Sequence, residues 1–204
     1  MRKYLLHILI ISIFSLVLST SSHVSAQSLQ LSMKYYIKAK NLGKQGKYLE
    51  AAEMCEKAVH AEKTSPSPMM EALAAYFKQA GRFYSLVGQY DKAIKYHEEA
   101  LDIGKRLGVE AGVAASLNDI GLVYYSRGQY DKAIKYYEEA LAIARKLGKE
   151  DSVATYLNNI GGVHNSWGQY DKAIKYHEEA LAIARKLGKE DSVATYLNSI
   201  GGVH

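Results

Sequence analysis

The sequence predicts an all-α fold, a solenoid of antiparallel helix pairs, and three observations lead to it. Residues 128–164 recur at residues 168–204 with only two differences, so the chain repeats with a period of forty residues. Apolar residues in each unit recur at three- and four-residue steps, which is the pattern of amphipathic helices. Glycines recur where helices are expected to end or to touch. Such a period is typical of stacked repeats that form an extended binding surface.

Each unit contains signals for two helices. The first begins at Asp131, whose carboxylate is expected to accept first-turn amide protons. Gly148 follows its last turn and is expected to end it. A second helix is predicted from Asp151 or Ser152, with Gly168 allowing the turn into the next unit.

A glycine stands in the middle of the second predicted helix. Gly161 costs that helix about 1 kcal/mol relative to alanine. The same place in other units holds Gly81, Gly121 and Gly201. This recurrence indicates that helices approach each other closely there.

A family resemblance rests on the spacing of these residues. Residues 157–180 contain Leu157-x2-Ile160-Gly161-x2-His164, then Gly168, Tyr170 and Ala173-x3-His177-x2-Ala180. This pattern resembles the tetratricopeptide repeat (TPR), and it covers residues 32–204. The period of forty residues, against about 34 in the common TPR, resembles bacterial TPR proteins and the longer repeats of kinesin light chains. The resemblance implies a right-handed α-solenoid.

The predicted organisation follows from the repeats and from the N-terminal residues. It consists of a signal peptide at 1–26, a short lead-in at 27–31, a divergent first repeat at 32–65, a proline-containing linker at 66–73, repeats 2, 3 and 4 at 74–113, 114–153 and 154–193, and the first helix of a truncated fifth repeat at 194–204.

The signal peptide is predicted from a short basic start and an apolar run. Arg2 and Lys3 precede the apolar residues 5–18, and small residues end at Ala26, where cleavage is expected. The mature protein would then be periplasmic or extracellular. The alternative is an uncleaved anchor that tethers the repeats to the outer face of the inner membrane, although the run is short for a span of about 20 residues.

Charge and composition argue against several classes of function. The net charge of +5 comes from interleaved basic and acidic residues, not from a basic stripe, so nucleic-acid binding is not supported. No paired nucleophile and base or phosphate-binding glycine loop occurs, so we expect neither an enzyme nor a cofactor. His164 and His177 could be metal ligands, but hydrogen-bonded core histidines are the favoured interpretation. The single cysteine, Cys55, lies on an apolar stripe and is expected to be buried.

The candidate binding residues come from the resemblance, because the first helices of TPR pairs line a concave groove that holds an extended peptide or a helix. Counted by the bounds of repeats 3 and 4, the first helix of each pair is the one that precedes the turn at Gly128 or Gly168. The positions carried over are Asn118, Leu122, Tyr125, Asn158, Asn159 and Asn165, with Lys78 and Arg82 continuing the surface toward a basic end. A carboxamide has a donor and an acceptor, so it can bind a peptide backbone of any sequence. The alternative is that the asparagines only cover an exposed helix face.

The sequence therefore predicts a non-enzymatic scaffold that binds a protein or an extended peptide, with no membrane contact beyond the signal segment. Two alternatives stay open. The chain could be the sensory or docking arm of a longer protein whose effector domain lies beyond residue 204. It could also self-associate, because the apolar face of its last helix has no partner helix and solenoids need a polar cap.

Overall fold

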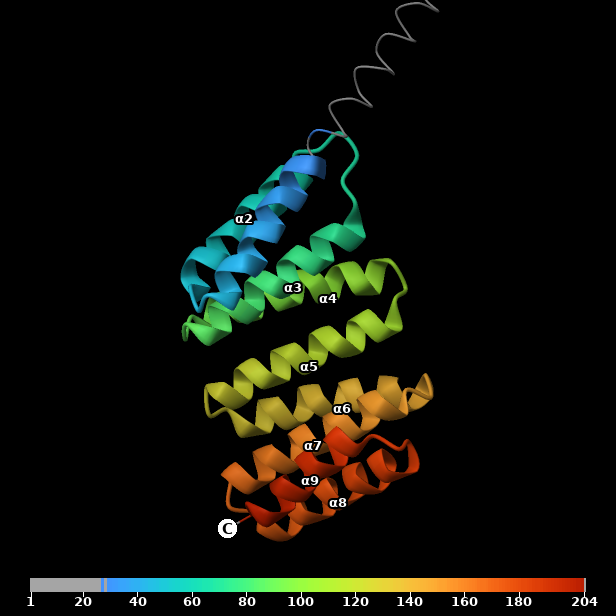
Figure 1. The fold of residues 1–204 in the computed structure, drawn as a ribbon. Helices are drawn as coiled ribbons and strands as arrows, with labels where there is room; N and C mark the ends of the chain where they lie inside the picture. The colour runs from blue at the N-terminus through green and yellow to red at the C-terminus, as the bar shows by residue number, and fades with distance from the viewer. Residues whose placement is uncertain (1–26, 28, 204) are drawn as a thin grey trace, which may run out of the picture. The chain divides into compact units, whose positions relative to one another are not determined.

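The structure is a computed structural model that describes residue 27 and residues 29–203. The described residues form helices and short connections without strands (Figure 1). The predicted signal peptide, residues 1–26, lies outside them. The chain divides into two compact units, Met1–Phe83 and Tyr84–His204. Within the described residues, no helix combines the length and the apolar character needed to cross a membrane.

The first unit contains a helix over residues 29–44, then α2 (Tyr48–Lys63) and the greater part of α3 (Met70–Leu86). Residues 64–69 join α2 to α3 and include both prolines. The fully buried Glu62 anchors this connection, because its Oε1 accepts the backbone N–H of Met69 at 2.8 Å. Its Oε2 accepts the Ser32 hydroxyl at 2.7 Å, which ties α2 to the preceding helix.

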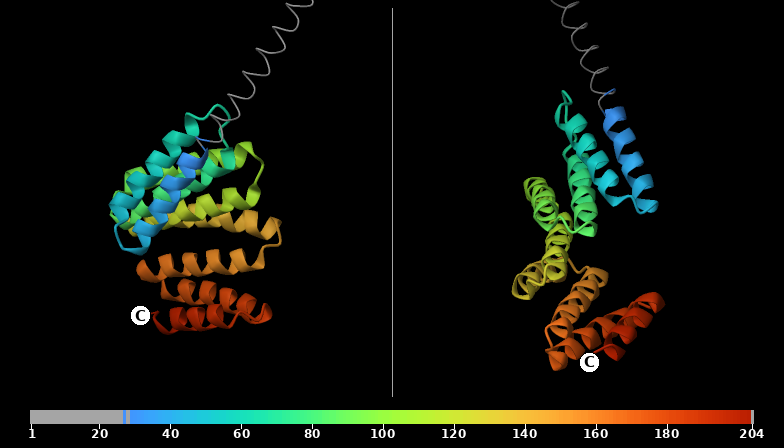
Figure 2. Two further views of the ribbon diagram at one scale, coloured as in Figure 1. Left: turned by 45° about the horizontal axis from the view of Figure 1, so that its top comes forward. Right: turned by 90° about the vertical axis from the view of Figure 1, so that its left-hand side faces the viewer.

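The second unit is a regular series of helices. They are α4 (Tyr90–Arg106), α5 (Glu110–Ser126), α6 (Tyr130–Lys146), α7 (Glu150–Ser166), α8 (Tyr170–Lys186) and α9 (Glu190–Gly201). Helices α4 to α8 each have 17 residues, and three residues separate each helix from the next. Consecutive helices pack against each other, as α7, α8 and α9 do in both views of Figure 2. The unit is a stack of antiparallel helix pairs, so the predicted all-α solenoid architecture is confirmed.

The connections share one backbone motif that a glycine makes possible. Gly148 has φ +64°, a conformation that side chains with a Cβ avoid. The N–H of Lys149 donates to the carbonyl of Ala144 at 3.0 Å, and Gly148 donates to Arg145 at 3.1 Å. These bonds satisfy carbonyls at the helix end. The prediction that Gly148 and Gly168 permit the turns is confirmed, and positive φ recurs at Gly46, Gly88, Gly108, Gly128 and Gly188.

The prediction for the start of the helix near Asp131 was wrong in one respect. Helix α6 begins at Tyr130, its N-cap residue is Gln129, and no side chain makes a capping hydrogen bond. Asp131 lies inside the first turn, where its negative charge interacts favourably with the positive end of the helix dipole. Its carboxylate therefore remains available for other contacts.

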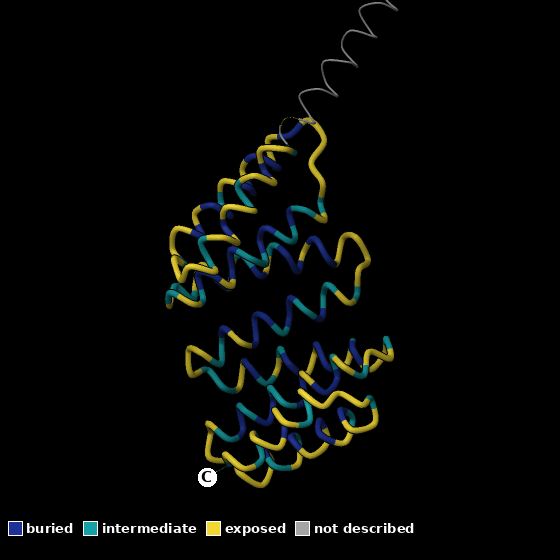
Figure 3. The backbone as a smooth tube through the Cα atoms, in the orientation of Figure 1, coloured by how far each residue is buried: buried dark blue, intermediate teal, exposed yellow. Residues whose placement is uncertain are grey.

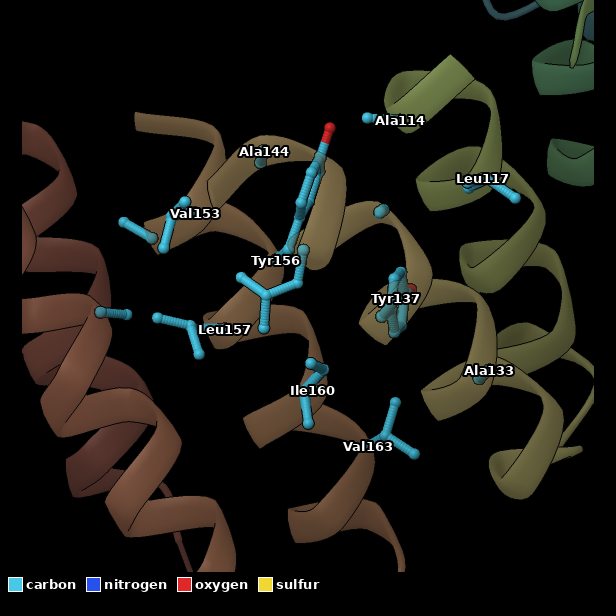
Figure 4. Packing of buried hydrophobic residues seen from close by; sticks show 14 of the residues in the cluster. Ala114, Leu117, Ala133, Tyr137, Ala144, Val153, Tyr156, Leu157, Ile160 and Val163 are labelled. Atoms are coloured by element: carbon cyan, nitrogen blue, oxygen red, sulfur yellow. The ribbon is translucent and has the colours of Figure 1, made fainter. Parts of the chain in front are cut away.

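The core of the second unit is built from one face of each helix. Buried positions alternate with exposed ones along the helices, whereas the connections between helices are exposed or partly exposed (Figure 3). Tyr137 of α6 and Leu157, Ile160 and Val163 of α7 belong to this core, together with the small Ala133 (Figure 4). Small residues beside large ones allow neighbouring helices to pack at native density.

Mid-helix glycines mark close contacts between helices, as predicted. A Cβ on Gly121 would lie 2.8 Å from Cδ1 of Tyr137, and a Cβ on Gly161 would lie 2.7 Å from Cε1 of His177. Real Cβ atoms do not approach so closely, so the ring on the following helix requires glycine there. Gly201 does not follow the rule, because a Cβ there would meet nothing within 4 Å. No helix follows α9 within the described residues to supply a ring.

Candidate functional site

The first helices of successive pairs in the second unit, α5, α7 and α9, border a pocket of about 250 Å³, which we call the groove. Its lining residues are Leu122, Tyr125, Tyr137, Asn158, Asn159, Gly162, Asn165, His177, Asn198, Ser199 and Gly202. The asparagines stand on first helices, while Tyr137 and His177 reach the pocket from the second helices α6 and α8. The site therefore combines a floor of two aromatic rings, Tyr137 and His177, with a wall that carries the asparagines.

The floor holds one polar contact that fixes a wall residue. His177 is 2% exposed, and its Nδ1 lies 2.9 Å from Oδ1 of Asn158. Burial lowers the pKa of His177 from its ordinary value, so the neutral ring is favoured. A neutral ring that donates from Nδ1 satisfies the Asn158 oxygen and leaves the Asn158 Nδ2 group for other partners.

The other repeat histidine also has a hydrogen-bond partner inside the protein. His164 is buried, its Nδ1 lies 2.9 Å from Oε1 of Gln169, and its ring stacks on Tyr176 with centroids 5.4 Å apart. Burial is the main cause that lowers the pKa of His164. Both histidines are thus hydrogen-bonded core residues, as predicted. Within residues 29–203, no three histidine, cysteine or acidic side chains gather where they could hold a metal ion.

Two asparagines from adjacent repeats pair across the groove. Nδ2 of Asn159 donates to Oδ1 of Asn118 at 2.8 Å, and both side chains are partly exposed. The pair uses one donor and one acceptor, so the Nδ2 donors of Asn118 and the Oδ1 acceptor of Asn159 remain. A peptide unit presents a carbonyl acceptor and an N–H donor, which can pair with this unused donor group and this unused acceptor.

Two further contacts join the wall across repeats. The Tyr125 hydroxyl and the Ser166 hydroxyl are 2.8 Å apart and link α5 to α7. Nδ2 of Asn165 donates at 3.2 Å to the main-chain carbonyl of Gly202, which follows α9. The second contact shows an asparagine of the groove binding a backbone carbonyl within the chain itself. Beside these polar groups, Leu122 is 46% exposed and offers an apolar contact.

The structure brings most of the predicted binding residues together. Leu122, Tyr125, Asn158, Asn159 and Asn165 all line the pocket, and Asn118 joins it through its bond to Asn159. Lys78 and Arg82 lie on α3 in the first unit and do not line this pocket. Whether any of these residues binds a ligand stays a prediction.

Sequence reasoning did not assign several lining residues to the groove. Asn198 and Ser199 stand forty residues after Asn158 and Asn159, so the period itself could have identified them. Gly162 follows the packing glycine Gly161, but a Cβ there would meet nothing within 4 Å. The period distinguishes the two glycines, because Gly161 recurs as Gly81 and Gly121, whereas Arg82 and Leu122 stand at the position of Gly162 in the earlier units.

The fold and the groove define an α-solenoid of helix pairs, a class in which repeats expose an extended surface. The sequence profile described as Tetratricopeptide repeat matches residues 70–146 and 151–204, which is more than half of the chain. The chain belongs to the tetratricopeptide repeat family. No match is found among curated proteins.

Solved structures share this fold at low sequence identity. BtubC (BKLC) from P. vanneervenii is 23% identical over 91% of this chain and 80% of its own, with a TM-score of 0.73. A putative kinesin light chain from Podosopora anserina with nearly identical TPR-like repeats is 20% identical over 85% of this chain and 88% of its own, with a TM-score of 0.65. A Rap protein complexed with Competence and Sporulation Factor is 20% identical over 85% of this chain and 48% of its own, with a TM-score of 0.70. These likenesses confirm the fold that the residue pattern predicted.

Proposed function

We propose that this protein is a non-enzymatic scaffold that binds an extended peptide, or an extended segment of a partner protein, in the groove over α5, α7 and α9. The observation that carries the proposal is the row of side-chain amides in one pocket, Asn158, Asn159, Asn165 and Asn198. Amides in such a row can bind main-chain groups regardless of the ligand sequence.

The contacts within the chain support this mode of binding. Asn165 already donates to a main-chain carbonyl, that of Gly202. The Asn118–Asn159 pair leaves a donor and an acceptor for a peptide unit. The exposed Leu122 and the half-buried Tyr125 would then contact a ligand side chain, so main-chain binding and an apolar preference act together.

The similar Rap structure provides a second line of support. That protein is complexed with Competence and Sporulation Factor, and this chain spans about half of its length. The shared helix-pair architecture is therefore compatible with a bound partner. The kind of partner that we propose for this chain rests on the side chains of its groove and not on this similarity.

A selection from a displayed library of random peptides tests the proposal. Selected peptides would be labelled and titrated with the protein by fluorescence anisotropy. Asn159→Ala is expected to weaken binding by about 2- to 10-fold, since a hydrogen bond contributes about 0.5–1.5 kcal/mol. The exposed Lys175 on α8 does not line the pocket, so Lys175→Ala is the matched control and should leave the affinity unchanged.

Two results would contradict the proposal. If no peptide is enriched over a library without the protein, the groove is not a peptide site. If Asn159→Ala and Leu122→Ala bind the selected peptides as tightly as the wild type, the peptides bind another surface.

We further propose that the protein is exported and acts outside the cytoplasm. The proposal rests on the basic start at Arg2 and Lys3, the apolar residues 5–18 and the small residues that end at Ala26. N-terminal sequencing of the protein recovered from its native cells tests it. A mature chain that starts at Gln27 supports cleavage, whereas an intact Met1 supports the anchored form or no export.

A further inference from the structure

A second pocket, of about 410 Å³, lies where the connection before α6 meets the end of α7. Its lining residues are Gly128, Gln129, Tyr130, Asp131, Lys132 and Trp167. The rings of Tyr130 and Trp167 have centroids 6.1 Å apart and an interplanar angle of 48°. Trp167 is 41% exposed. The pocket thus has two aromatic walls and one carboxylate, that of Asp131, and we call it the Trp167 corner.

The preceding repeat shows which group fits such a corner. Forty residues before Trp167 stands Arg127, and forty residues before Asp131 stands Asp91. There, Nη1 of Arg127 donates to Oδ1 of Asp91 at 2.6 Å. The chain itself therefore places a guanidinium on the carboxylate at this position of the repeat.

In the Trp167 corner the guanidinium is missing. An indole cannot form an ion pair with a carboxylate, and no ion pair of Asp131 is recorded among the described residues. Lys132 also lines the corner, but its Nζ lies over the ring of Tyr124, 5.1 Å from the centroid. The lysine among the lining residues therefore contacts an aromatic ring outside the corner.

Gln129 adds an acceptor that has no donor. Its Oε1 is buried and makes no hydrogen bond within the described part of the chain. Its counterpart in the next repeat, Gln169, accepts from Nζ of Lys172 at 2.9 Å. An oxygen at this position can accept from a cationic group, and a buried acceptor without a donor is costly. Because the Gln129 oxygen is itself buried, a ligand would reach it only after the side chain rotates.

We propose that the Trp167 corner binds the guanidinium of an arginine side chain from a partner protein. The carboxylate of Asp131 would accept two parallel N–H bonds from the planar guanidinium. Trp167 would supply an aromatic face for stacking and cation–π attraction. The corner shares no lining residue with the asparagine groove, although the ring of Tyr130 contacts that of Tyr125 with centroids 6.0 Å apart, and the proposal does not depend on the groove.

The chain has one tryptophan, so the fluorescence of the full-length protein reports on this corner directly. The probe is acetyl-arginine amide, and its neutral counterpart is acetyl-citrulline amide, which has nearly the same shape. We expect a saturable change in Trp167 fluorescence with the arginine probe, with half-saturation on the order of millimolar. The citrulline probe should give at most a fifth of the apparent affinity, and acetyl-lysine amide should bind more weakly than the arginine probe.

Asp131→Asn is the first variant. It keeps the shape of an exposed side chain and removes the charge, and it should weaken binding of the arginine probe at least fivefold. Asp171→Asn, the same substitution forty residues later and outside the corner, should leave this binding unchanged. An equal response to arginine and citrulline, or an unchanged affinity of Asp131→Asn, would overturn the proposal.

Trp167→Arg is the second variant, because it copies the arrangement of Arg127 and Asp91. The new side chain should occupy the corner and pair with Asp131, so isothermal titration calorimetry should detect no binding of the arginine probe. Circular dichroism should show unchanged helicity, since the preceding repeat carries the same pair. Binding with wild-type affinity to this variant would show that the probe occupies a different site.

Discussion

His177 and Asn158 join the floor of the groove to its wall, with Nδ1 and Oδ1 2.9 Å apart. The bond occupies one lone pair of the Asn158 oxygen, so the Nδ2 group is the part of Asn158 that it leaves wholly available to a ligand. Replacing Asn158 by alanine would leave a buried ring nitrogen without a partner and should lower stability. Asn159, whose partner Asn118 is partly exposed, is therefore the cleaner probe of binding.

The first prediction concerns the dependence of stability on pH. Burial lowers the pKa values of His164 and His177 in the folded protein, so at mildly acidic pH the unfolded chain binds more protons. The free energy of unfolding should therefore be retained above the ordinary histidine pKa of 6.5 and fall as pH drops below it. Urea denaturation at a series of pH values from about 7.5 to about 5 measures this loss.

A variant isolates the contribution of one histidine. Tyr137 occupies the position of His177 one repeat earlier, packed against Gly121 as His177 packs against Gly161. His177→Tyr should fold and should lose less stability on acidification than the wild type. An identical pH dependence in both proteins would mean that His177 does not contribute.

The second prediction concerns two adjacent glycines in α7. A Cβ on Gly161 would lie 2.7 Å from Cε1 of His177, whereas a Cβ on Gly162 would meet nothing within 4 Å. Gly161→Ala should therefore destabilise the protein by about 1–3 kcal/mol through overpacking. Gly162→Ala should stabilise it by up to about 1 kcal/mol, because alanine is the better helix former.

Thermal and chemical denaturation of both variants provide the measurement. The two substitutions are chemically identical and one residue apart, so each is the control of the other. Equal effects of the same sign would contradict the packing assigned to Gly161.

The fold could be predicted from the sequence because the same forty-residue pattern occurs several times. Each unit repeats the same apolar steps and the same glycine after each helix, so Gly148 and Gly168 indicated turns that the structure confirms at positive φ. The sequence indicated the start of a helix less well than its end. Asp131 is a good capping residue type, yet the helix starts one residue earlier and the carboxylate makes no cap.

The candidate site was predictable in its location but not in its bonds. The family pattern placed Asn158 and Asn159 on one groove, and both line it. Their partners differ, since Asn158 bonds to His177 on the floor and Asn159 to Asn118 on the adjacent repeat. Neighbouring residues on a helix point about 100° apart, so side-chain direction, which the residue types do not specify, decides each partner.

The third prediction concerns Glu62, which holds the connection between α2 and α3. Its two oxygens accept from Ser32 and from the N–H of Met69, and the residue is fully buried. Glu62→Ala should destabilise the protein by about 1–3 kcal/mol, because two donors lose their acceptor. Glu62→Gln should cost less, since the Ser32 hydroxyl can reverse and accept from the new amide.

Chemical denaturation measures both variants, with the exposed Glu53 on the same helix as control. Glu53→Ala should change the free energy of unfolding by less than about 0.5 kcal/mol. Equal stability of Glu62→Ala and Glu53→Ala would show that the buried carboxylate does not secure the connection.

The last prediction concerns the reactivity of Cys55, the only cysteine of the chain. The residue is fully buried, and burial, followed by the nearby charge of Glu56, raises the pKa of its thiol to about 12. The thiolate is the reactive form, so both its small population and its burial protect it. Ellman's reagent at about pH 8 should therefore react at least about 100-fold more slowly with the native protein than with the protein in denaturant, as access requires unfolding. Comparable rates in the two conditions would mean that α2 opens readily in the native state, against the packing observed around Cys55.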